Sequence, residues 1–299
     1  MNTVSALVKR NVKLFFKDKG MFFTSLITPA ILLVLYATFL GKVYRDSFTA
    51  SLPPALALSE RLIDGLVGGQ LISSILAVST VTVSFCSNFL MVQDKASGAI
   101  RDLTISPVKP AALSLGYYIA TLFSTLIICF VAAVICLAYV GIVGWYLSAA
   151  DVLLLLLDIL LLVLFGTALS SIINFFLSSQ GQISAVGTIV SSGYGFICGA
   201  YMPISSFHEG LQKVISFLPG TYGTALIRNH AMRGALAEMQ SEGIPAEVIE
   251  AIKDSIDCNL YFFAREVSLG AMYAVLCGTV AVLVGIYILM NVLKSKRAV

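Results

Sequence analysis

Charged residues are scarce in this chain of 299 residues, since Asp, Glu, Lys and Arg together make up only 12% of it. Soluble globular domains carry about 25% charged residues. The chain also has a single tryptophan and only two histidines, His208 and His230. Both histidines fall outside the apolar runs, and no spacing joins them to other metal ligands. The composition therefore excludes an ordinary soluble domain and gives no indication of a metal site.

Motifs that bind nucleotides or perform covalent chemistry are absent as well. The sequence has no G-x-x-x-x-G-K-[ST] phosphate loop, no G-x-G-x-x-G turn and no H-E-x-x-H zinc motif. It also lacks a G-x-S-x-G nucleophile turn. We therefore expect that the chain is not itself an enzyme and binds no cofactor. If it performs active transport, the energy must come from another chain or from an ion gradient.

Apolar residues, in contrast, are abundant: they make up 58% of the chain, and the mean hydropathy is +0.94. A helix needs about 20 apolar residues to cross a membrane. Six continuous runs meet this requirement, and their lack of a two-residue alternation favours helices over a barrel. The predicted spans are 21–41, 66–92, 113–140, 152–177, 183–202 and 267–293. We expect one all-α polytopic membrane domain over residues 1–299, with a kink at Pro29.

Positive charge is concentrated on one side of the implied membrane. That side carries eleven Lys and Arg residues against three acids, and the other side carries eight cations against twelve acids. The eleven are Lys9, Arg10, Lys13, Lys17, Lys19, Lys95, Arg101, Lys109, Lys294, Lys296 and Arg297. Because cytoplasmic loops are enriched in Lys and Arg, we expect a multi-pass protein of the cell membrane with both termini in the cytoplasm. The charge gives no indication of a nucleic-acid partner.

Residues 1–20 are expected to form an amphipathic helix on the cytoplasmic side of the membrane. One helical face collects the apolar residues Val4, Leu7, Val8, Leu14 and Phe15. The opposite face collects the basic residues Lys9, Arg10, Lys13 and Lys17. A helix of this kind lies in the headgroup region of the bilayer.

A single acid, Asp158, falls inside a predicted span. It lies about six residues into the fourth span, on the order of 10 Å below the outer surface. An acid at this depth marks a functional site by default. The alternative is structural: the carboxylate pairs with a neighbouring helix or faces a water-filled crevice.

The loop between the second and third spans is the most distinctive segment. It reads Gln93-Asp94-Lys95-Ala96-Ser97-Gly98-Ala99-Ile100-Arg101-Asp102-Leu103 and continues to Pro107. Residues 96–104 are expected to form a short helix parallel to the membrane, with Ile100 and Leu103 on one face, and Pro107 ends it. An apolar ridge with charged flanks fits a groove on a soluble partner, and a plain solvated turn is the alternative.

In this loop the chain resembles the permease subunits of type-2 ABC exporters. That family shows in order an acid, a Gly, a Leu, a Pro, and then Leu and Gly at the start of the next span. The matching residues are Asp94, Gly98, Leu103, Pro107, Leu113 and Gly116. The first acid is more often Glu in the family, so Asp94 is a mild departure. The resemblance implies a coupling helix that seats in a separate ATPase subunit and includes Ile100, Arg101 and Asp102.

Residues 203–266 are expected to form an external segment. Phe207, Leu211, Val214, Ile215 and Leu218 make an apolar face on a helix too short to span, which predicts a re-entrant or outer-interface helix. The family also places a short outer helix between the fifth and last spans. Within 235–265 the sequence predicts one further amphipathic helix. Its apolar face is Val248, Ile249, Ile252 and Ile256, and its charged face is Glu247, Glu250, Asp254 and Asp257.

The resemblance also implies a substrate pathway lined by the second and fifth spans, between two permease chains that form a homodimer. Those spans are rich in hydroxyl groups and carry no charge at mid-membrane. The candidate pathway residues are Ser73, Ser74, Thr80, Ser84, Asn88, Thr188, Ser191 and Tyr194. Because Ser and Thr also bond their own helix backbone, a purely structural role is the alternative for each.

The sequence thus predicts the transmembrane subunit of an ATP-driven exporter, with ATP and Mg bound by the partner subunit. A mixed hydroxyl and apolar lining favours a drug-like, antibiotic or other amphipathic cargo. Export of a lipid-linked glycan or a peptide is an alternative. A gradient-driven carrier that depends on Asp158 and an integral-membrane enzyme acting on lipid are further alternatives.

Overall fold

The computed structural model describes residues 3–50, 58–105, 108–263 and 265–297, and these form helices almost throughout. In chain order the elements are α1 (Thr3–Lys17), α2 (Lys19–Leu35), the π-helical turn η1 (Tyr36–Leu40), α3 (Gly41–Ala50), α4 (Glu60–Ala96), α5 (Ala99–Ile105), α6 (Pro110–Val143), α7 (Ala149–Phe176), α8 (Gln180–Ile197), the 3-10 turn η2 (Ile204–Ser206), α9 (Glu209–Ile215), α10 (Pro219–Ser241), α11 (Ala246–Ser255), β1 (Tyr261–Phe262), β2 (Arg265–Glu266) and α12 (Leu269–Arg297).

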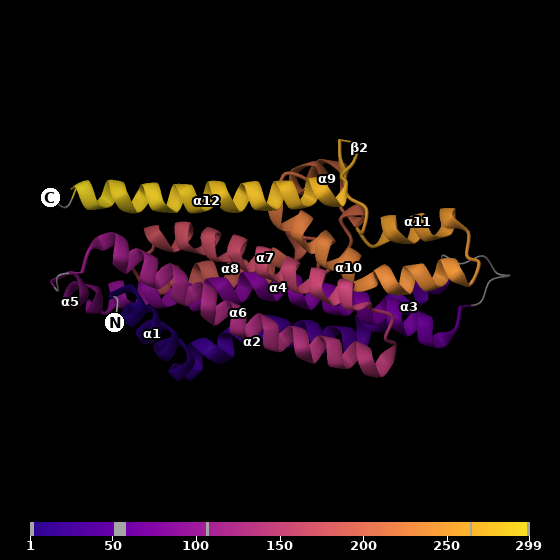
Figure 1. Ribbon diagram of the computed structural model, residues 1–299, viewed down its shortest axis with the longest axis horizontal. Coiled ribbons are helices and arrows are strands. Elements are labelled where there is room, and N and C mark those ends of the chain that lie inside the picture. Colours follow the sequence, from indigo (N-terminus) through magenta and orange to yellow (C-terminus); the bar gives the residue numbers. More distant parts are fainter. Residues whose placement is uncertain (1–2, 51–57, 106–107, 264, 298–299) are drawn as a thin grey trace.

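The long helices run side by side along one axis (Figure 1). Helix α5 and the two ends of the chain lie toward one end of the bundle, and α3 and α11 lie toward the other. Five stretches of the described residues are long and apolar enough to cross a membrane: 19–49, 60–96, 110–143, 149–176 and 269–293. The chain is therefore an all-α polytopic membrane protein. The remaining predicted span, 183–202, corresponds to α8, which is not among these five.

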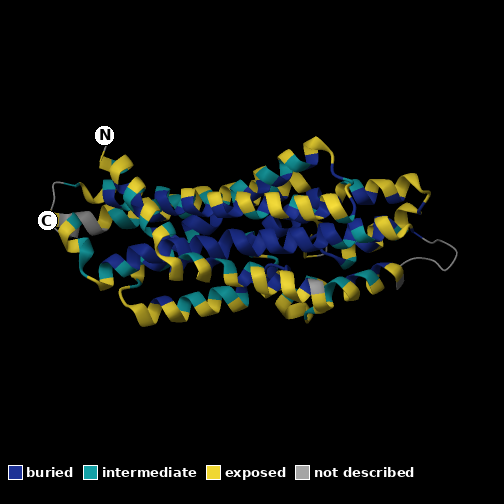
Figure 2. Ribbon diagram, turned by 90° about the horizontal axis from the view of Figure 1, so that it is seen from below, coloured by how far each residue is buried: buried dark blue, intermediate teal, exposed yellow. Residues whose placement is uncertain are grey.

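Helix α4 forms the centre of the bundle. It packs against α6, α7, α10, α2 and α8, and its apolar stretch is buried all the way round. Figure 2 shows it as the continuous buried helix along the axis. Its 37 residues extend beyond the predicted 66–92 at both ends, from the Ser59 cap to Lys95 in the last turn. A helix that is apolar on every side belongs in the interior of a large bundle.

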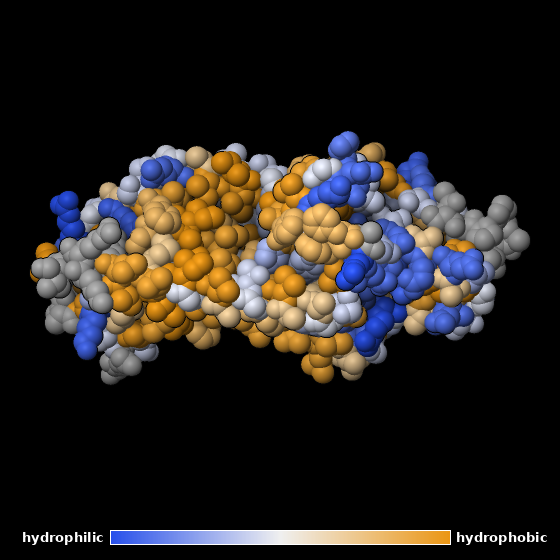
Figure 3. Space-filling model, turned by 90° about the horizontal axis from the view of Figure 1, so that it is seen from above, coloured by the Kyte–Doolittle hydropathy of each residue, from blue (hydrophilic) through white to orange (hydrophobic). Residues whose placement is uncertain are grey.

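Outward-facing apolar side chains cover much of the bundle. On α6 and α12 they include Phe123, Val134, Ile135, Val282, Ile288 and Leu289. Figure 3 shows hydrophobic residues over one half of a face and hydrophilic residues gathered near the other end. Exposed apolar area of this extent marks contact with another apolar phase, which for a polytopic membrane protein is lipid.

The first span is longer than predicted and contains a π-helical turn that the sequence did not predict. Helix α2 continues through Pro29, where the sequence predicts a kink, and the helix changes to a π-helical turn at Tyr36–Leu40. Helix α3 then extends it to Ala50. Arg45 on α3 forms an ion pair with Asp64 on α4, which fastens this extension to the central helix.

The N-terminal amphipathic helix is present as α1, and its apolar face is the one predicted. Leu7 and Phe15 are buried against the bundle, and α1 packs on α6. The prediction for Arg10 was wrong. Its guanidinium does not stay on the solvated face but reaches Asp94 of α4, with Nη1 2.8 Å from Oδ2. The remaining cations of that face, Lys9, Lys13 and Lys17, are exposed.

The segment 203–266 is only partly external. The predicted short outer helix is α9, and the predicted amphipathic helix is α11 with Ile249 and Ile252 buried. Between them, however, α10 enters the bundle and packs against α4, α7 and α12. Small residues allow this close packing, because a Cβ on Gly69 of α4 would lie 3.0 Å from the backbone oxygen of Ala231 on α10.

A buried ion pair and its hydrogen bonds join α10 to the turns that follow α8 and α11. Arg228 and Asp257 are both buried, with Arg228 Nη1 3.5 Å from Asp257 Oδ2. Arg228 also donates to the carbonyls of Gly199 and Ile256, at 2.7 and 2.6 Å. Asp257 accepts from the backbone N–H of Ile204 at 2.8 Å. We expected Asp257 on the charged face of α11, but a left-handed backbone at this residue, φ 56°, turns it inward.

This burial generates a pH prediction. Burial raises the pKa of the Asp257 carboxyl to about 6, and Arg228 opposes that rise. The folded chain therefore keeps this proton up to about pH 6, whereas the unfolded chain releases it near pH 4. The contribution of Asp257 to the free energy of unfolding should fall as the pH rises from about 4 to about 6, by on the order of 3 kcal/mol. We expect Asp257→Asn to remove this fall, and Asn tolerates the left-handed backbone.

The measurement is thermal unfolding in detergent across this pH window for the wild type and Asp257→Asn. The difference between their unfolding free energies should change below about pH 6 and level off above it. Glu247→Gln, at an exposed acid on α11, is the matched control and should follow the wild-type profile. A difference that stays constant with pH would contradict the assignment.

Candidate functional site

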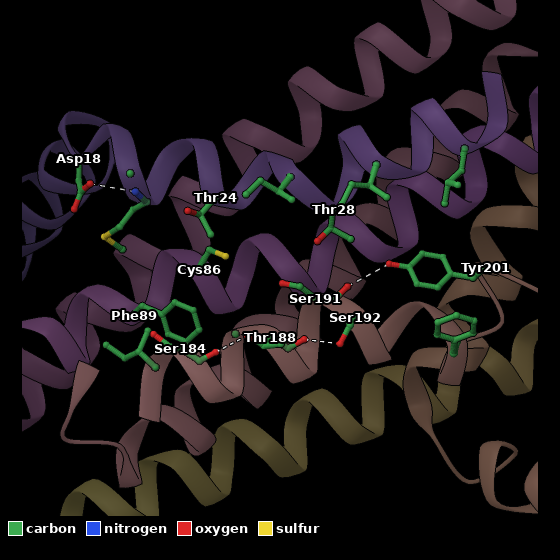
Figure 4. Close-up of a pocket in the computed structure, with 18 of the residues that line it drawn as sticks. Asp18, Thr24, Thr28, Cys86, Phe89, Ser184, Thr188, Ser191, Ser192 and Tyr201 are labelled. Atoms are coloured by element: carbon green, nitrogen blue, oxygen red, sulfur yellow. Dashed lines mark hydrogen bonds between the residues drawn. The ribbon is translucent and has the colours of Figure 1, made fainter. Parts of the chain in front are cut away.

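A groove with a volume of about 1010 Å³ runs along one side of the bundle (Figure 4). Helices α2 and α8 provide its walls, and both pack on α4, which provides Cys86, Phe89 and Gln93. Asp18 lies at one end of the groove and Tyr201 at the other. Most of its surface is apolar, and the polar groups are chiefly hydroxyls of the two walls.

The predicted pathway residues divide between the groove and the core. Thr188 and Ser191 of α8 line the groove as expected from the sequence. None of the five predicted α4 residues lines it, because all five are buried in contacts with the helix backbone or with other helices. These five are Ser73, Ser74, Thr80, Ser84 and Asn88.

The four predicted hydroxyls of α4 are hydrogen-bonded within the protein. Ser73 and Thr80 donate to carbonyls of their own helix, and Ser74 pairs with the hydroxyl of Tyr36 at 3.2 Å. Ser84 donates to the Thr80 carbonyl at 2.7 Å. These bonds agree with the structural alternative, which is the usual behaviour of Ser and Thr in membrane helices.

Two further predicted residues lie inside the bundle. Asn88 donates through Nδ2 to the hydroxyls of Ser170 and Ser171 on α7, at 3.1 and 2.9 Å. Tyr194 of α8 is buried, and its hydroxyl has no hydrogen-bond partner in the part of the chain that the structure describes. A Cβ on Gly220 of α10 would lie 2.5 Å from this hydroxyl, so the two helices meet here in close contact.

The short helix predicted in the 94–116 loop is α5, which begins at Ala99 rather than at residue 96. Helix α4 continues to Ala96, and Gly98 separates the two helices with a left-handed φ of 84°. No atom lies within 4 Å of a Cβ built on Gly98. Glycine is therefore favoured here by its left-handed backbone and not by a lack of space for a side chain. Pro107, the predicted end of this helix, lies outside the described residues.

The outward face of α5 differs from the expected one. Ile100 and Leu103 are half-buried and pack partly against the bundle. Arg101, Asp102 and Ile105 are exposed, and Ile105 is the most exposed of them, at 84%. The surface that α5 offers to a partner is therefore one apolar side chain flanked by charges.

Asp94 also differs from its predicted place, because it lies on α4 and points inward. Its carboxylate is paired with Arg10 of α1 and accepts a hydrogen bond from the hydroxyl of Tyr117 on α6 at 2.5 Å. The next residue, Lys95, donates from Nζ to the carbonyls of Asn174, Phe175 and Leu177 at the end of α7, at 2.9 to 3.1 Å. A cation at a helix C-terminus is favourable because the last carbonyls have no intrahelical donor.

The comparison with protein families agrees with this geometry. A sequence model described as ABC-2 type transporter matches residues 2–230, which is most of the chain and covers α1 to the middle of α10. The chain belongs to the ABC-2 type transporter family. No curated protein matches it. Membership of this family implies an ATPase partner in general.

The intramembrane acid of this ABC-2 chain lies apart from the groove. Asp158 of α7 is fully buried, with Oδ2 2.6 Å from Nδ1 of His230 on α10. The hydroxyl of Tyr273 on α12 donates to its other oxygen at 2.5 Å. The expectation that His230 is external was wrong, because α10 carries it into the bundle. Sequence spacing alone could not reveal the pair, since 72 residues separate its members.

The Asp158 cluster generates a stability prediction. Asp158→Ala leaves the buried His230 and the half-buried Tyr273 without their shared acceptor, so we expect a loss of about 2 kcal/mol in the free energy of unfolding. Asp158→Asn keeps an oxygen acceptor and should lose less. Unfolding in detergent measures both, with Leu157→Ala on the exposed side of α7 as the control for side-chain loss. Equal stabilities of Asp158→Ala and this control would refute a bracing role for the carboxylate.

Proposed function

We propose that this chain is the transmembrane subunit of an ATP-driven exporter that moves an amphipathic cargo along the groove between α2 and α8. Two copies of the chain assemble with two separate ATPase subunits, which bind ATP and Mg. The observation that carries the proposal is the pairing of a large, mainly apolar groove with an exposed short helix at one end of the bundle, in a chain of the ABC-2 type.

In this arrangement α8 is the sixth crossing. Its 18 residues span about 27 Å at 1.5 Å per residue, slightly less than a bilayer core. An even number of crossings is supported by the two ends of the chain lying toward the same end of the bundle (Figure 1). The excess of Lys and Arg near that end supports its cytoplasmic location. The turn η2 and helix α9 then form the re-entrant segment on the outer side.

Coupling to the ATPase takes place at α5. Its exposed Ile105, flanked by Arg101 and Asp102, suits a shallow groove on a soluble subunit. Movement of α5 reaches the bundle through α4, because Asp94 and Lys95 at the end of α4 are bonded to α1, α6 and α7. ATP binding and hydrolysis can bias two arrangements of the bundle only if the ATPase binds them with different affinities.

A second copy of the chain closes the open side of the groove. The α2 and η1 side chains near the opening are apolar and exposed in the single chain, among them Ile27 and Ile31 of α2 and Phe39 of η1. Together the two copies enclose a pathway that excludes lipid, and cargo moves between groove hydroxyls without meeting a charged barrier. Lipid-linked glycans and peptides remain alternative cargoes for the same pathway.

A gradient-driven carrier without an ATPase is the second candidate function, and Asp158 is the observation that favours it. The environment of Asp158 weakens this candidate, because both carboxylate oxygens are occupied by His230 and Tyr273. Asp158 is also absent from the lining of the groove. The cluster thus fits a brace between α7, α10 and α12.

The decisive experiment is affinity purification of the chain from its native membrane, with mass spectrometry of associated proteins. We expect a soluble ATPase in roughly equal amount, and its loss in Ile105→Asp, since a carboxylate at the contact removes apolar burial on the order of 2 kcal/mol or more. Ile105 is the suitable site because its exposure leaves the fold unaffected, whereas Leu103→Asp would also disturb packing.

Ile105→Leu is the matched control and should retain the ATPase. Membrane abundance of Ile105→Asp equal to that of the wild type shows that insertion is intact. Recovery of the wild-type chain without any ATPase would overturn the exporter proposal and favour gradient-driven flux.

A further inference from the structure

The groove carries a stripe of hydroxyl groups between otherwise apolar walls. Its members are Thr24 and Thr28 on α2 and Ser184, Thr188, Ser191 and Ser192 on α8. Figure 4 shows the α2 hydroxyls and the α8 hydroxyls projecting from the two walls of the same space. A cargo molecule with a polar head and an apolar body would therefore meet its polar partners along one line of the groove.

Several polar protons along this stripe are already committed to backbone. Thr188 donates to the Ser184 carbonyl at 2.9 Å, and Ser192 donates to the Thr188 carbonyl at 2.6 Å. Tyr201 likewise donates to the Ser191 carbonyl at 3.3 Å. A hydroxyl whose proton is used in this way still has an acceptor lone pair. The stripe therefore offers more acceptors than donors to a bound molecule.

The charge of the groove likewise favours a bound molecule that donates hydrogen bonds. Among the described residues that line it there is no Lys, Arg or His, and its one carboxylate is that of Asp18 at the end opposite Tyr201. One oxygen of Asp18 caps α2 by accepting from the N–H of Met21 at 3.1 Å. Cys86 and Tyr201 also line the groove but are neutral at pH 7, so Asp18 is its one charged group among the described residues. The neighbouring Lys17 and Lys19 are exposed and do not line the groove. An anionic head would lose its hydration here without gaining a cation.

We propose that the groove selects neutral or cationic amphiphiles that carry hydrogen-bond donors, such as an ammonium or hydroxyl head on an alkyl body, and discriminates against anionic ones. The apolar walls take the alkyl body, and the hydroxyl stripe with Asp18 takes the donors. This selection deepens the proposed export function by naming its cargo class, although binding to the groove itself requires no ATPase.

The test is photolabelling of the purified chain in lipid nanodiscs with three amphiphiles that share one diazirine-bearing dodecyl chain. Their heads are a primary amine, a maltoside and a sulfonate. Peptide mapping by mass spectrometry reports labelling of α2, α4 and α8 separately from α12, so partition into the lipid does not mask the result. We expect the amine to label the groove about tenfold more than the sulfonate, the equivalent of one charge-assisted hydrogen bond, with the maltoside between them.

Three variants assign the labelling to the groove. Gly187→Phe fills it, because a Cβ at residue 187 already lies 3.3 Å from Phe89, and it should abolish groove labelling by all three amphiphiles. Thr188→Val keeps the shape but removes the acceptor, and should lower amine labelling about threefold. Thr279→Val is the matched control, since Thr279 makes the same type of backbone bond on α12, to Val275 at 2.8 Å, outside the groove. It should leave groove labelling unchanged.

Equal labelling of the groove by the sulfonate and the amine would overturn the charge selection. Labelling that persists in Gly187→Phe would overturn the groove as the binding site. Neither outcome depends on the ATPase. Its co-purification tests the export function separately, so failure of the cargo class and failure of the exporter assignment give different results.

Discussion

The burial of α4 on every side is the constraint on which the rest of the structure depends. A central helix without a lipid-facing side must satisfy each of its polar groups inside the protein, because no water is available there. Most of its hydroxyls do so through carbonyls of their own helix or through α7 and the turn η1, whereas Ser87 Oγ has no partner among the described residues. The helices around α4 are then fixed by packing, with α6, α7 and α10 against it in the core and α2 and α8 flanking the groove.

Sequence reasoning could predict the features that depend on local properties. The length and apolar character of 66–92, 113–140, 152–177 and 267–293 are properties of short windows, and each of these runs lies within one helix to within two residues. The short helix after Gly98 could also be predicted, although not its outward face. That face depends on how the bundle meets Ile100 and Leu103, which no local pattern contains.

The buried part of the external segment could not be predicted, because its burial depends on distant partners. Helix α10 contains Arg228 and His230, which make it look like a surface helix in any window. Arg228 pairs with Asp257 and His230 pairs with Asp158, 29 and 72 residues away in the sequence. The lining of the groove could not be predicted for a related reason: composition gives the residue type, but the neighbours of α4 decide which of its faces meets the groove.

The adjacent pair Asp94 and Lys95 has a mechanical consequence. One side chain is bonded to α1 and α6 and the other to the end of α7, so the tail of α4 and these three helices form a single rigid block. The left-handed backbone of Gly98 lies directly after that block and before α5. Gly98 is thus the point at which α5 can change its direction relative to α4. A movement imposed on α5 would be passed through this residue to the whole central helix.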